Sequence, residues 1–153
     1  QVMANSIREK IVKDIILKLQ DINTVPMGVV KREPMFRDQT EFYNLARTAF
    51  PHVIVTAGNE EREDLTIGAG KLRQGMLQIE IVCFVKASDK SIDETINDLI
   101  EAIEEKLDAD RKRDSNAHDT QITQVQMGEP MEHPYGQFIM RCQVQYTFTA
   151  GAL

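Results

Sequence analysis

Two stretches of the chain repeat apolar residues at the three- and four-residue spacing of an amphipathic helix. The apolar positions are Ile7, Ile11, Val12, Ile15, Ile16, Leu19 and Ile22 in the first stretch and Ile92, Ile96, Leu99, Ile100, Ile103 and Leu107 in the second. Each stretch opens with a capping box, Ser6 to Glu9 and Ser91 to Glu94, in which the serine covers a free amide and the glutamate reaches back. The pattern predicts two helices, each with one apolar face and one charged face.

A period of two residues marks the strands, because successive side chains of a strand point to opposite faces. In residues 76–85 the positions on one face are Leu77, Ile79, Ile81, Cys83 and Val85, and in the last strand they are Phe138, Met140, Cys142, Val144, Tyr146 and Phe148. Val82 and Phe84 make the first of these strands apolar on both faces near its end, which predicts a central place in the sheet. Residues 27–33, 52–58 and 121–127 read as shorter strands.

The order of these elements predicts an α+β fold. It runs helix, strand, irregular segment, strand, loop, long strand, helix, strand, strand, which favours a mainly antiparallel sheet of four to five strands with two helices packed on one face. We expect a single domain spanning residues 3–153, with Met3 as the native start after Gln1 and Val2; this length is enough to bury a hydrophobic core. Residues 36–50 fit either a short helix or an ordered loop.

Glycines at residues 67–75 raise the possibility of a phosphate-binding loop, since the stretch reads IGAGKLRQG. A P-loop requires Ser or Thr after its lysine and a helix after that, whereas Leu72 and a strand follow Lys71. The dinucleotide fingerprint fails as well, because Arg73 stands where its third glycine would be. Residues 59–75 are therefore predicted to form a long loop between two strands.

The charges of that loop suggest a role in contacts. A loop of this length is usually functional or disordered, and its mixed charges fit either a protein–protein contact or a solvated hairpin arm; both readings stay open. The candidate contacts with other subunits or partners are six loop residues and two from the polar, solvent-facing side of the last strand. They are Glu60, Glu61, Arg62, Glu63, Lys71, Arg73, Arg141 and Gln143.

The charge balance argues against a protein that grips nucleic acid. Lys and Arg total 18 against 24 Asp and Glu, for a formal net charge of −6, whereas phosphate contacts require a basic face. The sequence has one basic cluster, residues 111–113, and it is flanked by Asp108, Asp110 and Asp114. We expect it to be a solvated turn after a helix.

No group of residues predicts catalysis, a cofactor or a metal. Cys83 and Cys142 fall on apolar strand faces and read as reduced core thiols, and His52, His118 and His133 are scattered without metal-ligand spacing. No polar residue interrupts an apolar face of the predicted elements, as a catalytic side chain ordinarily would. No apolar run reaches the length of a membrane span, and the first ten residues lack the layout of a secretory signal. We expect a cytoplasmic protein that is not an enzyme.

Four segments carry a family resemblance: SIREKIVKDIILKLQDI, HVIVTAG, GKLRQGMLQIEIVCFVKASDKSIDETINDLIEAIEEKL and FIMRCQVQYTFTA. In order and length they resemble the phage tail terminator family, whose members complete the tail and join it to the head, and the resemblance in layout extends over nearly the whole chain. The resemblance implies a homo-oligomeric ring, commonly a hexamer, that caps the tail tube and docks on the neck.

The implied partners are other copies of the chain, the tail tube protein and the neck or connector protein, while DNA passes through the ring without specific binding. The resemblance implies no cofactor, no catalysis and no membrane, and a place in the tail or neck of the virion after assembly in the host cytoplasm. Two alternatives stay open. One is a ferredoxin-like small-molecule-binding or regulatory domain, with His52 or His133 at the mouth of a pocket between helices and sheet. The other is a small enzyme that uses the wet face of the sheet.

Overall fold

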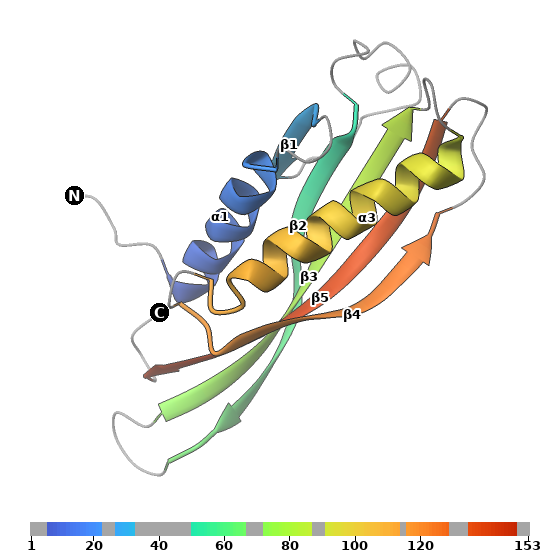
Figure 1. Ribbon diagram of the computed structural model, residues 1–153. Helices are drawn as coiled ribbons and strands as arrows, with labels where there is room; N and C mark the ends of the chain where they lie inside the picture. The colour runs from blue at the N-terminus through green and yellow to red at the C-terminus, as the bar shows by residue number, and fades with distance from the viewer. Residues whose placement is uncertain are drawn as a thin grey trace.

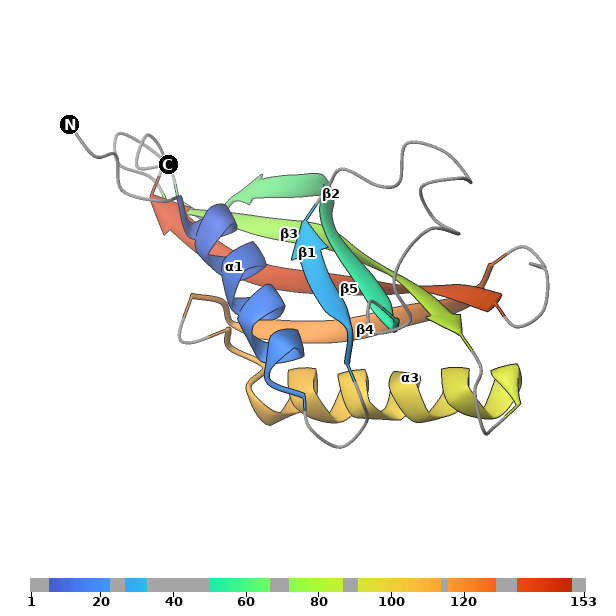
Figure 2. The ribbon, with the colours of Figure 1, turned by 90° about the horizontal axis from the view of Figure 1, so that it is seen from above.

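The computed structural model describes residues 6–22, 27–32, 50–66, 72–86, 91–113, 116–128 and 135–149. Along these ranges the elements are α1 (Ile7–Gln20), β1 (Val29–Arg32), β2 (His52–Asp64), β3 (Leu72–Lys86), α3 (Ile92–Ala109), β4 (Asp119–Met127) and β5 (Tyr135–Thr149). The strands form one five-stranded sheet in the order β1-β2-β3-β5-β4. The β1–β2 pair is parallel and every other pair is antiparallel. Both helices lie on the same side of the sheet (Figures 1 and 2), which confirms the predicted α+β fold.

Both helices begin where the capping boxes predict. The Ser6 hydroxyl accepts a hydrogen bond from the Glu9 amide at 3.1 Å, and the Ser91 hydroxyl accepts one from the Glu94 amide at 3.2 Å. The Glu9 carboxylate is engaged elsewhere, because it accepts a hydrogen bond from Arg32 Nη1 at 2.6 Å. The start of α1 is therefore tied to β1, its neighbour in the fold.

The core fills the space between the helices and the sheet. Every residue predicted for the apolar faces of the two long strands is buried, and the helices contribute Ile11, Val12, Ile15, Leu19, Ile96, Leu99, Ile103 and Leu107. β3 is the central strand, as its two-sided apolar end predicts. On the opposite face of the sheet, Ile54 and Phe84 form a second, smaller apolar cluster with Phe50, Val82 and Tyr135.

The two cysteines are buried free thiols, as predicted. Burial raises the pKa of the Cys142 thiol to about 12 and also raises the pKa of Cys83. At neutral pH both side chains are uncharged members of the core.

The predicted loop at residues 59–75 is the main correction to the fold. β2 continues to Asp64 and β3 already begins at Leu72, so most of the stretch is a paired hairpin, and its residues 67–71 lie outside the described ranges. Residues 59–66 and 72–76, here called the hairpin arm, continue past the two helices, toward the bottom of Figure 1. Among the described residues no helix covers this end of the sheet. Charged residues therefore stand on both faces of the arm, and the apolar–polar alternation typical of a strand is absent.

The basic cluster after α3 also differs from the prediction. Arg111 and Lys112 are exposed, but Arg113 is fully buried and adopts a positive φ of 51°. Its Nη2 donates to the Leu107 carbonyl at 2.5 Å, and its Nη1 lies 3.4 Å from Asp14 Oδ2 on α1. Burial lowers the pKa of Arg113, and the Asp14 charge opposes that shift. An ion pair thus interrupts the apolar layer between the helices, contrary to the expectation that no polar residue would do so.

Two sequence-based expectations are only partly covered by the described ranges. Of residues 36–50, only Phe50 is described, and the choice between a short helix and a loop lies outside the described residues. In the described ranges no helix is long and apolar enough to cross a membrane.

Candidate functional site

A polar cluster fastens the hairpin arm to the first turn of α1. Glu60 Oε1 accepts a hydrogen bond from the Tyr146 hydroxyl at 2.6 Å and lies 3.5 Å from Arg8 Nη1. Arg8 Nη2 in turn donates to the Gly58 carbonyl at 2.9 Å. The Glu60 side chain is only 4% exposed. These contacts fix the direction in which the arm leaves the sheet.

A bulge in β2 places Glu60 on the helix side. The β2–β3 register shifts between Ala57 and Glu60, so that Glu60 lies opposite Leu77, a core residue. Without the extra residue, the alternation that buries Val53 and Val55 would turn Glu60 to the outer face. Bulges re-aim side chains in this way, and here the result is a carboxylate within reach of α1.

A glycine on β3 makes room for the tyrosine that reaches Glu60. Gly75 lies between Arg62 on β2 and Tyr146 on β5. A Cβ atom at residue 75 would lie 2.7 Å from Cε1 of Tyr146. The ring therefore lies across the backbone of β3, and its hydroxyl meets the carboxylate of the next strand.

Arg62 completes the cluster. Its guanidinium pairs with Glu60 and lies 4.8 Å from the centre of the Phe148 ring, a cation–π contact. The hydrogen bond to Glu60 raises the pKa of Arg62. Burial, with a further contribution from Glu60, raises the pKa of Tyr146 to about 12. At neutral pH the Tyr146 hydroxyl is therefore protonated and donates its hydrogen bond to Glu60.

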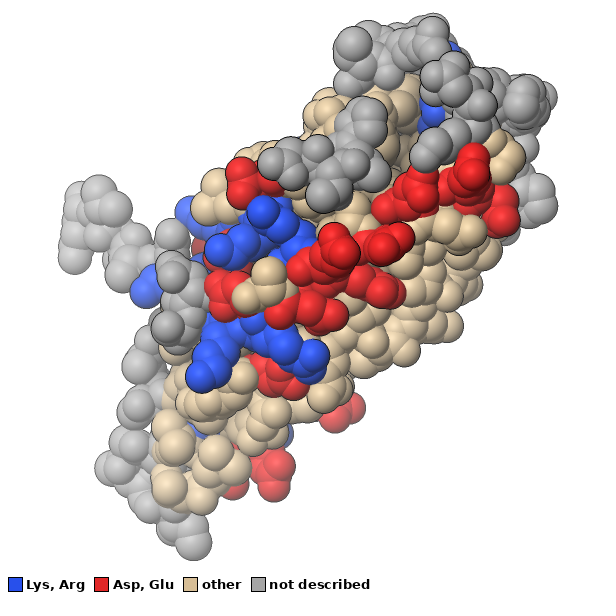
Figure 3. All heavy atoms as spheres, viewed as in Figure 1, with Lys and Arg blue, Asp and Glu red and all other residues tan. Residues whose placement is uncertain are grey.

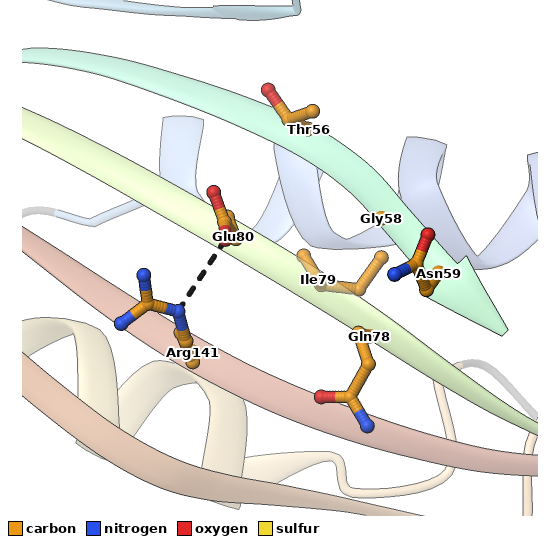
Figure 4. A pocket seen from close by; sticks show the side chains of 7 residues that line it. All are labelled: Thr56, Gly58, Asn59, Gln78, Ile79, Glu80 and Arg141. Atoms are coloured by element: carbon orange, nitrogen blue, oxygen red, sulfur yellow. Dashed lines mark hydrogen bonds and ion pairs between the residues drawn. The ribbon is translucent and has the colours of Figure 1, made fainter.

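The outer face of the sheet carries an open hollow of about 370 Å³ (Figure 4). It is lined by Thr56, Gly58, Asn59, Gln78, Ile79, Glu80 and Arg141. Arg141 Nε lies 3.4 Å from Glu80 Oε1, while its Nη1 donates to Gln124 at 3.1 Å and to Gln126. The charge of Arg141 is engaged by neighbours on β3 and β4. The hollow offers amides and one ion pair, which suits contact with a polar surface.

The predicted contact residues fall on two sides of the sheet. Glu60 and Arg62 meet on the helix side, where Arg73 Nε also donates to Asp64 at 2.8 Å. Glu61 and Glu63 are exposed. The other residues of the set are Arg141 and Gln143, on the outer face of β5, and Lys71, outside the described residues. Their role in partner contacts stays a prediction.

Arg8 and the polar role of Tyr146 were not predicted from the sequence. Tyr146 continues the apolar alternation of β5, which predicts a core residue, and this is correct for its ring. Gly75 was the available signal, since a glycine inside a strand often marks a close approach. Arg8 carries no comparable signal, because an arginine in a first helical turn is ordinary.

The helices present oppositely charged surfaces (Figure 3). α3 carries seven acidic residues and one lysine, a net charge of −6 that equals the formal charge of the whole chain. α1 carries four basic and two acidic residues, a net charge of +2. The acidic character of the protein is therefore concentrated on one helix.

In the described ranges, no group of three or more His, Cys, Asp or Glu side chains is placed to hold a metal ion. Compared with known proteins, the sequence matches no family model and no curated protein.

Proposed function

We propose that this chain is a structural subunit of a homo-oligomeric ring that caps a phage tail tube and joins it to the neck. The observation that carries the proposal is the two-sided construction of the sheet. One face is covered by α1 and α3, while the central and β4 parts of the other face carry long polar side chains without a covering element among the described residues.

The composition of that outer face supports a role in assembly. Its polar positions, assigned by alternation with the buried residues, are Thr56, Gln78, Glu80, Gln121, Gln124, Gln126, Gln137, Arg141, Gln143, Gln145 and Thr147. Of these, Glu80 and Arg141 are charged and pair with each other. Asp119, opposite Gln145 on the same face of β4, pairs with Arg111. In a ring, a nearly neutral polar face can pack against the neighbouring subunit or line the channel. In the channel it would let DNA pass, because it has little net positive charge to bind phosphates.

Closed rings also account for unpaired sheet edges. β4 lies at one edge of the described sheet and has neither lysine nor proline among its nine residues, two of the devices that block edge pairing. A third device, an irregularity in the pairing, is present between Ile122 and Gln124. Rotational symmetry can cover such an edge in every subunit without producing fibres. Tail tube and neck proteins would then bind the two ends of the ring.

The alternative of a ferredoxin-like binding domain has less support. That fold has the order β-α-β-β-α-β, whereas the described elements run helix, three strands, helix, two strands. His52 is buried and His133 lies outside the described residues. The hollow of Figure 4 lies on the face away from the helices, and its open form gives little enclosure for a small molecule.

Two measurements test the proposal. The solution mass of the purified chain should be that of a closed oligomer. Removal of the protein during phage assembly should yield overlong tails or tails not joined to heads, as seen by electron microscopy. Tails of normal length joined to filled heads in its absence would overturn the proposal.

A further inference from the structure

Large apolar side chains are exposed at the end of the hairpin arm and on α1. Leu65 and Leu72 are 46% and 38% exposed at the end of the hairpin arm, and Leu17 is 64% exposed on α1. Single exposed leucines are common, but each of these lies beside a row of charges, and the two rows have opposite signs.

The arm carries the negative row. The Leu65 amide donates to the Leu72 carbonyl at 2.8 Å, which continues the β2–β3 pairing by one step. By alternation, Glu61, Glu63 and Leu65 share one face of the arm, and Leu72 lies beside Leu65 on that face. Glu61 and Glu63 are exposed. From the end of β2 toward the sheet, the outer face of the arm thus presents an apolar residue, Leu65, followed by two acidic ones, Glu63 and Glu61.

α1 carries the positive row. Its exposed positions are Lys10, Lys13, Leu17 and Gln20, at helical spacing along one stripe. The Lys13 side chain is 53% exposed. Arg32 on the adjoining strand is 46% exposed and pairs at 2.6 Å with Glu9, whose carboxylate also lies 3.9 Å from Lys13. The three side chains together keep a net positive charge on this side. From Leu17 toward the start of the helix, the stripe therefore presents an apolar residue followed by two basic ones, Lys13 and Lys10.

The two rows have matching lengths. Along a helix, Lys13 and Lys10 lie about 6 Å and about 10 Å from Leu17. Along a strand, Glu63 and Glu61 lie about 7 Å and about 13 Å from Leu65. These differences are within the reach of flexible lysine and glutamate side chains.

We propose that the end of the hairpin arm of one copy docks on the α1 stripe of a second copy, with Leu65 and Leu72 against Leu17 and the two glutamates against the two lysines. The inference rests on the proposed ring and names the contact that closes it. Within one chain the rows are kept apart, because Arg8 and Glu60 hold the base of the arm at the first turn of α1 while the arm continues past the helix (Figure 1). Every copy offers both surfaces, so the contact is head-to-tail and can form a ring.

Charge exchange between two variants tests this contact on the full chain. Variant E61K/E63K places cations on both surfaces, and variant K10E/K13E places anions on both. Each alone should lose self-association by more than about tenfold, because like charges then face each other. An equimolar mixture should regain it, since every arm can then meet a stripe of opposite charge. The quadruple variant, with both rows exchanged, should associate by itself.

Native mass spectrometry and sedimentation velocity at low and high salt measure the assembly, and circular dichroism checks the fold. E101K/E105K on the exposed surface of α3 is the matched control, with the same charge change as E61K/E63K and no expected loss. A monomeric parent chain, two single-surface variants that assemble like the parent, or a mixture that fails to recover would each overturn the contact. A ring that forms through this contact but does not cap tail tubes would overturn the proposed function alone.

Discussion

Gly75 on β3 lies directly opposite Tyr146 on β5, and the tyrosine ring occupies the space that a side chain at residue 75 would need. This arrangement carries the Tyr146 hydroxyl across the central strand to Glu60 on β2. The arm is therefore held by contacts that cross three strands and reach α1. Its direction is a property of the folded chain before any partner binds.

Replacing Gly75 by Ala should lower the free energy of unfolding by about 1–3 kcal/mol, the usual cost of forcing an extra methyl group into a packed site. The aromatic ring must move, and its bond to Glu60 moves with it. Urea denaturation measures the effect. Gln74→Ala, at the neighbouring and partly exposed position, is the control and should change stability by less than about 0.5 kcal/mol. Equal stability of G75A and the parent would mean that the ring is free to shift.

Stability should fall as the pH rises from about 10 toward about 12, because the pKa of Tyr146 is raised from 10.0 to about 12 in the folded chain. A phenol with a raised pKa favours the folded state while it is protonated, and that contribution is lost as the pH passes the unfolded and then the folded pKa. Tyr146→Phe should remove this part of the pH dependence. The check is to measure denaturation midpoints of the parent and of Tyr146→Phe at several pH values. Lysines also titrate in this range, but they are the same in both proteins, so the difference between the two curves reports the contribution of Tyr146. Parallel curves for the two proteins would contradict the prediction.

Replacing Asp14 by Ala should destabilise the chain by about 3–5 kcal/mol, because it leaves the buried charge of Arg113 without its partner. The double replacement D14A/R113M removes both charges and should cost less than the sum of D14A and R113M measured separately. Chemical denaturation of the four proteins forms a double-mutant cycle. Additive costs would show that the two side chains do not interact.

The regular parts of the fold could be predicted because their patterns are local. Alternation over many residues identifies β3 and β5, and Ser6 and Ser91 mark the helix starts within a few positions of the chain. The buried alternation also places Cys83 and Cys142 in the core. Each of these signals is complete within one segment.

The arm and the buried ion pair could not be predicted in the same way. Residues 60–64 pair with β3, but beyond Glu60 they extend past the helices. Both faces of this part of the strand therefore carry polar residues, and its sequence is typical of a loop. Arg113 looks like the third member of a solvated basic run until α1 brings Asp14 beside it. The contacts of Glu60 depend on a bulge in β2 and on a tyrosine from another strand. These features arise from tertiary pairing between distant segments.

Two isoleucines of α3 offer a test of how the helix lies on the sheet. Both Ile100 and Ile103 belong to the apolar stripe of the sequence, but Ile103 is fully buried while Ile100 is only partly buried at the border of the core. Ile103→Ala should therefore cost about 2–5 kcal/mol, the range for a large-to-small change inside a core. Ile100→Ala should cost less, because part of the removed surface already faces water. Urea denaturation of both variants measures the difference, and equal costs or the reverse order would mean that α3 is rotated about its axis relative to the packing described here.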